Sequence, residues 1–107
     1  MYFSYTVIYV SDVESTMNFY KNAFNLSENF LHESKQYGEL NTGDTKIAFV
    51  YNSLAQSNGV KFVKNDLKND APGFEIALAN KNVKQAYQLA IKKGASFAGS
   101  FCIGQAF

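Results

Sequence analysis

The sequence predicts an α+β fold in which two βαβββ modules share one curved, mixed sheet, with helices on its convex face and the second module incomplete. Three observations support this prediction. A strand-like segment leads directly into an amphipathic helix near the start of the chain, and the same succession returns 70 residues later. Three further strand-like segments follow the first helix. A single βαβββ unit leaves one sheet face uncovered, whereas two units side by side enclose a concave face.

The first module begins with a strand and a helix. Residues 3–10, FSYTVIYV, are rich in the β-branched and aromatic side chains that favour strands. The next residues, SDVE, have the spacing of a capping box, so we expect Ser11 to cap the helix and Glu14 to reach back to it. Asn25 is expected to end the helix in the left-handed conformation. The apolar side chains of one helix face are Val13, Met17, Tyr20 and Phe24.

Three strand-like segments complete the first module, and a polar connector follows. The segments are SENFLHES, QYGELNTG and TKIAFVYN, and the turn sequence Thr42-Gly43-Asp44 separates the last two. The periodicity is then lost in a stretch that contains Asn58-Gly59 and the only proline. We therefore expect a first module over residues 1–52 and a connector over residues 53–72, within one domain.

The second module, over residues 73–107, repeats the strand and the helix. GFEIALAN, residues 73–80, is predicted to be a strand. Asn80 or Asn82 can cap the helix that follows, and Lys92-Lys93-Gly94 is a suitable helix end. Val83 and Tyr87 of this helix correspond to Val13 and Met17 of the first. The final SFAGSFCIGQAF is strand-like but interrupted by glycines, and we expect the second module to be incomplete.

Composition excludes several classes of function. The formal net charge is +1, which gives no electrostatic case for binding nucleic acid or an anionic membrane. The apolar N-terminal run is too short to span a bilayer, and it lacks the basic residues of a signal peptide. Cys102 is the only cysteine, which fits a cytoplasmic protein without an internal disulfide. Nothing in the sequence links it to the single histidine, His32, so no catalytic residue can be assigned.

The chain resembles the vicinal oxygen chelate superfamily, which comprises glyoxalases, bleomycin-resistance proteins and extradiol dioxygenases. The segments that carry the resemblance are YTVIYVSDVESTMNFYKNAFNL, YGELNTGDTKIAFV, and GFEIALANKNVKQAYQLAIKKGA with GQ shortly after. They cover essentially the whole chain, and their order and spacing are more specific than any one of them. The resemblance implies paired βαβββ modules, a frequent homodimer, and a small-molecule site in the concave face of the sheet.

The chain departs from this superfamily at the metal-binding positions. The resemblance places metal ligands on the first strand of each module and near the end of the last strand of each. These positions fall on Tyr5, on Glu75, and on or beside Ala48. Only Glu75 is a good ligand, and catalytic divalent metals need about three protein donors, so we expect neither a metal nor another cofactor.

A second departure concerns the C-terminus. Relatives continue past the GQ dipeptide with two more strands, which carry a D-x-x-G turn and usually a terminal glutamate. The sequence is therefore expected to be truncated at its C-terminus. An unfinished sheet exposes unpaired backbone groups, and we expect a second copy of the chain to pair with that edge in a homodimer.

The alternation of side chains along each strand predicts which residues form a ligand site. If Tyr5 and Glu75 point to the concave face, every second residue of their strands does so too. The same alternation brings Tyr9, Tyr37 and Glu39 to that face. Tyrosine rings and carboxylates together attract cations. Two interpretations of Glu75 are open. It either contacts a ligand or acts as a general base, or it is a carboxylate without such a role on a partly solvent-exposed sheet face. Tyr5 and Tyr9 either contact a ligand, or fill the concavity or a dimer interface.

Three hypotheses about function follow. The first is a metal-free protein of the bleomycin-resistance type that binds an aromatic or cationic small molecule in the concave face. The second is a metal-dependent enzyme, similar to lactoylglutathione lyase or a dioxygenase, whose missing ligands come from a partner chain. The third is a truncated family member without activity.

Overall fold

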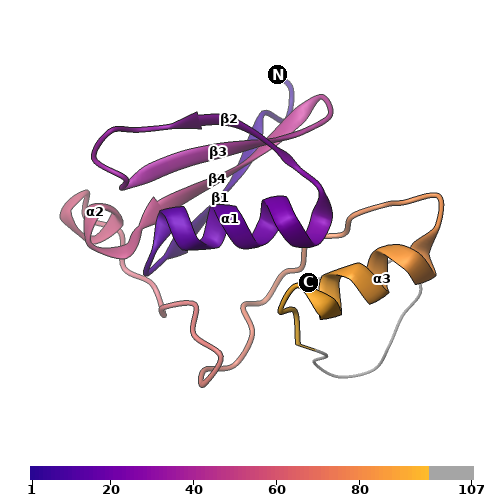
Figure 1. Ribbon diagram of the computed structural model, residues 1–107. Coiled ribbons are helices and arrows are strands. Elements are labelled where there is room, and N and C mark those ends of the chain that lie inside the picture. Colours follow the sequence, from indigo (N-terminus) through magenta and orange to yellow (C-terminus); the bar gives the residue numbers. More distant parts are fainter. Residues whose placement is uncertain (97–107) are drawn as a thin grey trace.

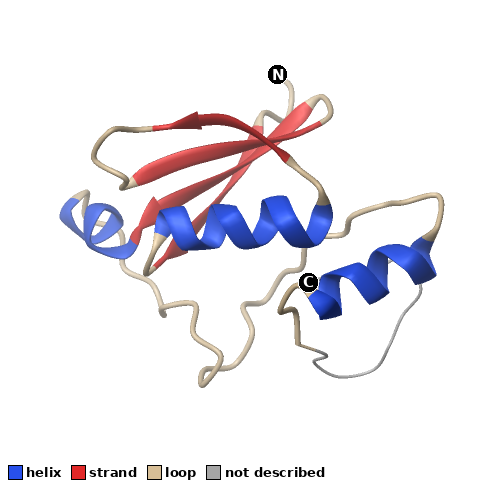
Figure 2. Ribbon diagram, viewed as in Figure 1, coloured by secondary structure: helices blue, strands red, loops and turns tan. Residues whose placement is uncertain are grey.

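A curved, four-stranded mixed sheet with a helix across one face forms the centre of the structure, a computed structural model that describes residues 1–96 (Figures 1 and 2). The elements are β1 (Tyr5–Val10), α1 (Val13–Phe24), β2 (Ser27–Leu31), β3 (Tyr37–Thr42), β4 (Thr45–Tyr51), α2 (Asn52–Ser57) and α3 (Val83–Lys92). The strand order is β1-β4-β3-β2, with β1 parallel to β4 and the other pairs antiparallel. The α+β class and the βαβββ order of the first module are therefore confirmed.

The first helix is capped one residue later than predicted. Asp12 has extended backbone geometry, and its Oδ1 accepts a hydrogen bond of 2.9 Å from the backbone N–H of Ser15. The prediction that Ser11 is the cap was wrong, because the helix begins at Val13 and the Asp12 carboxylate already satisfies the first-turn donor. Glu14, expected to reach back to the cap, instead pairs with Lys35 at 3.2 Å. The helix ends as predicted, at a left-handed Asn25 (φ 54°).

The hydrophobic core lies between α1 and the sheet. Its buried side chains are Val10, Val13, Met17, Leu40, Ile47 and Phe49. The helix approaches β3 most closely at Gly38, where an added Cβ would clash with Met17 and lie 3.3 Å from Cδ1 of Leu31. Gly38 and Leu40 both face α1, so the alternate residues of β3 point to the opposite side of the sheet.

The connector begins with a helix that the sequence did not reveal. α2 follows β4 directly and packs against β4 and β1. Six residues are too few to show a helical period, so this element was missed. Further along the connector, Phe62 packs against Tyr9 with ring centroids 4.7 Å apart, while Val63 is exposed.

The helix of the second module forms as predicted. Asn82 caps α3 by accepting a 3.1 Å hydrogen bond from the N–H of Gln85, and Gly94 follows the helix with a φ of 113°. α3 packs against α1. The two helices that the sequence predicts at corresponding positions of the two modules therefore both form, and they pack against each other.

The strand predicted over residues 73–80 does not form, so that prediction was wrong. This segment keeps the alternation of a strand, with Ile76 and Leu78 half-buried and Glu75, Ala77 and Ala79 exposed. Ile76 also packs against the core. A strand is defined by its backbone partners, however, and within residues 1–96 none pairs with this segment. The last strand-like segment and Cys102 lie outside the described residues.

None of the helices within residues 1–96 is both long enough and apolar enough to cross a membrane.

Candidate ligand-binding site

The face of the sheet opposite α1 carries four of the five residues predicted to bind a ligand. We call it the open sheet face, and its side chains come from Tyr5, Val7 and Tyr9 of β1, Lys46, Ala48 and Val50 of β4, Tyr37, Glu39 and Asn41 of β3, and Phe30 of β2. Strand register arranges them in rows, one of which runs Val7–Ala48–Glu39–Phe30. Tyr5, Val7 and Phe30 are each exposed by 40% or more, so the described chain leaves this face accessible.

Glu39 lies at the centre of a polar cluster on this face. Its Oε1 accepts a 2.8 Å hydrogen bond from Nδ2 of Asn29, and its Oε2 accepts one from the hydroxyl of Tyr37. Asn29 reaches Glu39 because β2 is irregular at that point: Glu28 pairs with Leu40, but the next pair is Phe30 with Glu39. This bulge leaves Asn29 as the extra residue and places both Asn29 and Phe30 beside the carboxylate.

The cluster fixes the charge state of its two titratable groups. The hydrogen bond from Tyr37 lowers the pKa of the Glu39 carboxyl below its ordinary value of 4.5, and Asn29 and the positive charge of Lys46 act in the same direction, against partial burial. Burial, the Glu39 carboxylate and the neighbouring Tyr5 raise the pKa of the Tyr37 hydroxyl far above its ordinary value of 10.0. At neutral pH, Glu39 is therefore an oriented anion and Tyr37 a neutral donor.

An apolar strip along β1 lies two strands away from Glu39. Tyr5, Val7 and Tyr9 project from it, and Phe62 of the connector covers part of Tyr9. Between this strip and Glu39 lies Ala48, which is completely buried by its neighbours. The face thus offers aromatic and aliphatic surface beside a fixed negative charge.

The structure does not bring Glu75 to this face. Glu75 is exposed on the segment 73–80, which is not part of the sheet. Three other polar residues at this face, Lys46, Asn41 and Asn29, were not predicted. Strand alternation could have found Lys46 from Ala48 and Asn41 from Glu39. It could not have found Asn29, because nothing in the local sequence signals the bulge of β2.

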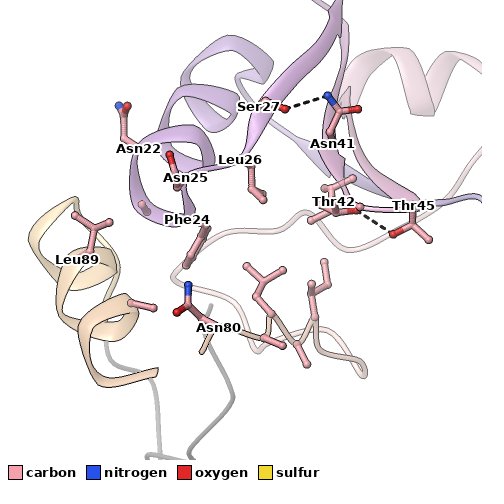
Figure 3. A pocket seen from close by; sticks show the side chains of 18 of the residues that line it. Asn22, Phe24, Asn25, Leu26, Ser27, Asn41, Thr42, Thr45, Asn80 and Leu89 are labelled. Carbon is pink, nitrogen blue, oxygen red and sulfur yellow. Dashed lines mark hydrogen bonds between the residues drawn. The ribbon is translucent and has the colours of Figure 1, made fainter. Parts of the chain in front are cut away.

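A second concavity lies on the helix side of the sheet, among α1, the β3–β4 turn, residues 76–80 and α3 (Figure 3). Its volume is about 1140 Å³. Amides, hydroxyls, apolar groups and the lysines Lys46 and Lys92 line it, with Asn41 bonded to Ser27 (3.1 Å) and Thr42 to Thr45 (2.9 Å). Asn41 and Lys46 lie near the ends of β3 and β4, so they border this concavity as well as the open sheet face. Neither a carboxylate nor a tyrosine lines it, and none of the predicted site residues does. The oriented ionised groups lie on the open sheet face, which is therefore the better candidate site.

A sequence model of the Glyoxalase/Bleomycin resistance protein/Dioxygenase superfamily matches residues 2–100. The chain belongs to this superfamily. Its fold is also similar to those of several solved structures.

A gene product of Arabidopsis thaliana is 19% identical with a TM-score of 0.65, and the match covers 94% of this chain and 78% of that one. A glyoxalase/bleomycin resistance protein/dioxygenase from Nocardioides is 13% identical with a TM-score of 0.65, covering 92% of this chain and 66% of that one. An integron cassette protein from the mobile metagenome of V. cholerae is 16% identical with a TM-score of 0.60, covering 94% and 73%. No curated protein sequence matches the chain significantly.

The positions at which superfamily resemblance placed metal ligands do not fit a metal ion. Tyr5 offers a single phenol oxygen, Ala48 has no donor atom in its side chain, and Glu75 is not on the sheet. Among residues 1–96, no group of three or more His, Cys, Asp or Glu side chains could hold a metal. His32 is exposed in the β2–β3 loop, where its Nδ1 lies 2.7 Å from the hydroxyl of Ser34.

Proposed function

We propose that this member of the glyoxalase/bleomycin-resistance superfamily is a small-molecule binding protein that takes an aromatic or cationic compound on its open sheet face without a metal. The observation that carries the proposal is Glu39, an ionised carboxylate oriented by Tyr37 and Asn29 beside exposed aromatic side chains. A ring or alkyl group of the ligand would cover Tyr5 and Val7, and its positive charge would lie against Glu39.

The energies of these contacts suit a small ligand. A hydrogen bond to a charged group contributes roughly 1.5–3 kcal/mol, and a cation over an aromatic ring about 0.5–2 kcal/mol. Covering a half-exposed aromatic side chain adds about 25 cal/mol for each Å² of apolar surface removed from water. Because Tyr37 and Asn29 already hold the Glu39 carboxylate in place, ligand binding costs little additional side-chain entropy at Glu39.

Calorimetric titration with phenethylammonium and with the uncharged 2-phenylethanol tests the proposal. Wild-type protein should bind the cation more tightly than the alcohol. Glu39→Gln removes the charge and should abolish that preference. Glu33→Gln removes an equivalent charge from the exposed β2–β3 loop and should leave the preference intact. Equal binding of the two compounds by wild-type protein would refute the role given to Glu39.

We also propose that the chain forms a homodimer. The edge predicted in the second module does not form within the described residues, but β1 is the edge strand of the sheet that does form. Among residues 1–96, its outer edge receives a side-chain hydrogen bond from Nδ2 of Asn65 to the carbonyl of Tyr9, at 3.0 Å. The other outward backbone groups of such an edge can pair with a second copy. Light scattering should give a dimer mass, and a monomer mass at tens of micromolar would refute the proposal.

A cytoplasmic location is proposed as well, since one cysteine in 107 residues suits a reducing compartment. Fractionation of cells that express the protein would test it, and recovery of the protein outside the cytoplasmic fraction would contradict it.

A further inference from the structure

The open sheet face carries a positive charge as well as a negative one. Lys46 of β4 pairs in register with Tyr5 on one side and with Asn41 on the other, whereas Glu39 pairs with Ala48. Lys46 and Glu39 are therefore diagonal neighbours on adjacent strands and on the same face. Such neighbours are separated by roughly 7–8 Å between their backbones.

The two charges influence each other without forming an ion pair. Lys46 contributes to keeping Glu39 ionised. Yet the ion pairs found within residues 1–96 are Lys21 with Glu28 and Lys35 with Glu14, so the Lys46 ammonium lies more than 4.0 Å from the Glu39 oxygens. Both oxygens of Glu39 are held instead by neutral donors, on the side chains of Asn29 and Tyr37.

Both charged residues are also partly withdrawn from water. Lys46 and Glu39 are half-buried, between the exposed apolar strip of β1 and Phe30 of β2. A ligand that covered this face would remove more water from both. A cation alone would then leave Lys46 without a partner, and an anion alone would leave Glu39 without one, and each unpaired group would cost binding free energy.

We propose that the ligand of this face is a zwitterion of the amino-acid type with an apolar or aromatic group. Its ammonium lies against Glu39, its anionic group against Lys46, and its apolar group on Tyr5 and Val7. This inference rests on the proposed function, and it narrows the ligand from cations in general to compounds with both charges. Lys46 then serves as a specificity determinant, because it rewards ligands with an anionic group and disfavours those without one.

Three probes that share one aromatic ring and differ in charge test the inference by calorimetry. They are phenylalanine, phenethylammonium and 3-phenylpropionate. Wild-type protein should bind phenylalanine about tenfold more tightly than phenethylammonium, with phenylpropionate the weakest. Lys46→Met should bring phenylalanine to the affinity of phenethylammonium, without weakening phenethylammonium itself. Lys46→Arg keeps the charge and should retain the preference, and Lys84→Met, on the exposed surface of α3, is the matched control.

The outcomes separate the two proposals. If phenethylammonium binds in a Glu39-dependent way but phenylalanine binds no more tightly, or if Lys46→Met leaves their ratio unchanged, the zwitterion inference is overturned and the proposed function stands. If none of the three probes binds wild-type protein, both are overturned. Circular dichroism of each variant verifies that a loss of the preference does not come from unfolding.

Discussion

The hydroxyl of Tyr37 donates a hydrogen bond to Oε2 of Glu39, two residues along the same strand and on the same face of the sheet. The bond joins a phenol whose pKa is raised to a carboxyl whose pKa is lowered. Since neighbours on one face of a strand cannot separate while the strand persists, the sheet itself keeps this pair assembled. The pair gives the face a fixed anion before any ligand arrives.

Replacing Tyr37 with Phe should raise the pKa of Glu39 toward 4.5. The change removes the largest influence that keeps the carboxyl ionised but leaves the aromatic ring in place. A pH titration of the side-chain carboxyl carbons by NMR measures the effect directly. Tyr9→Phe, which removes a hydroxyl from the same face, is the control. A Glu39 pKa unaffected by Tyr37→Phe would show that the hydrogen bond does not set the charge state.

Glu39 should make stability depend on pH in the acid range. Its pKa is lower in the folded state than the ordinary value of 4.5, so its contribution is present above that pH and is lost as the pH falls through the folded value. The difference in free energy of unfolding between wild type and Glu39→Gln should therefore be constant between about pH 5 and pH 7 and shrink below about pH 4.5. Urea denaturation at a series of pH values measures it. If the difference in free energy of unfolding between wild type and Glu39→Gln grew as the pH fell, the pKa of Glu39 would not be lowered by folding.

The N-terminus of α1 should depend on Asp12 and not on Ser11. Asp12→Ala removes the acceptor for the Ser15 N–H and should lower the free energy of unfolding by about 1 kcal/mol. Ser11→Ala, at an exposed residue outside the helix, should change it by less than about 0.5 kcal/mol. Chemical denaturation of the two variants compares them. A larger loss of unfolding free energy for Ser11→Ala than for Asp12→Ala would show that Ser11 caps the helix, as the sequence indicated.

Gly38 should tolerate no side chain, although a strand usually gains from losing a glycine. Gly38→Ala would press a methyl group against the buried Met17, and such overpacking typically costs about 1–3 kcal/mol. Gly73→Ala is the matched control, because no atom lies within 4 Å of the added methyl group. Thermal unfolding should show a lower midpoint for Gly38→Ala alone. Equal midpoints would mean that α1 does not approach β3 as closely as the structure shows.

The first module could be predicted from the sequence because its signals are local. Alternation assigned Tyr37, Glu39 and Leu40 to their correct faces, and the apolar period of residues 13–24 gave the helix. The choice between Ser11 and Asp12 was beyond this reasoning, because both residue types cap helices well and they are adjacent. The bulge at Asn29 depends on how β2 meets β3, which no local pattern reveals.

The second module shows the limit of the same reasoning. Its helix has local signals, in Asn82 and Gly94, and was predicted correctly. Residues 73–80 have the side-chain alternation of a strand and keep it in the structure, but a strand also needs a backbone neighbour. That neighbour is a distant part of the chain, so sequence pattern alone cannot guarantee it. Glu75 consequently loses the position on the sheet that made it a candidate.

Titration of phenethylammonium into wild-type protein, Glu39→Gln and Glu75→Gln tests the central claim most directly. Because Glu39 is the carboxylate that the structure orients on the open sheet face, Glu39→Gln should weaken binding about tenfold or more, and Glu75→Gln should bind as wild type does. Binding that survives Glu39→Gln and disappears with Glu75→Gln would contradict the account and move the site to the second module.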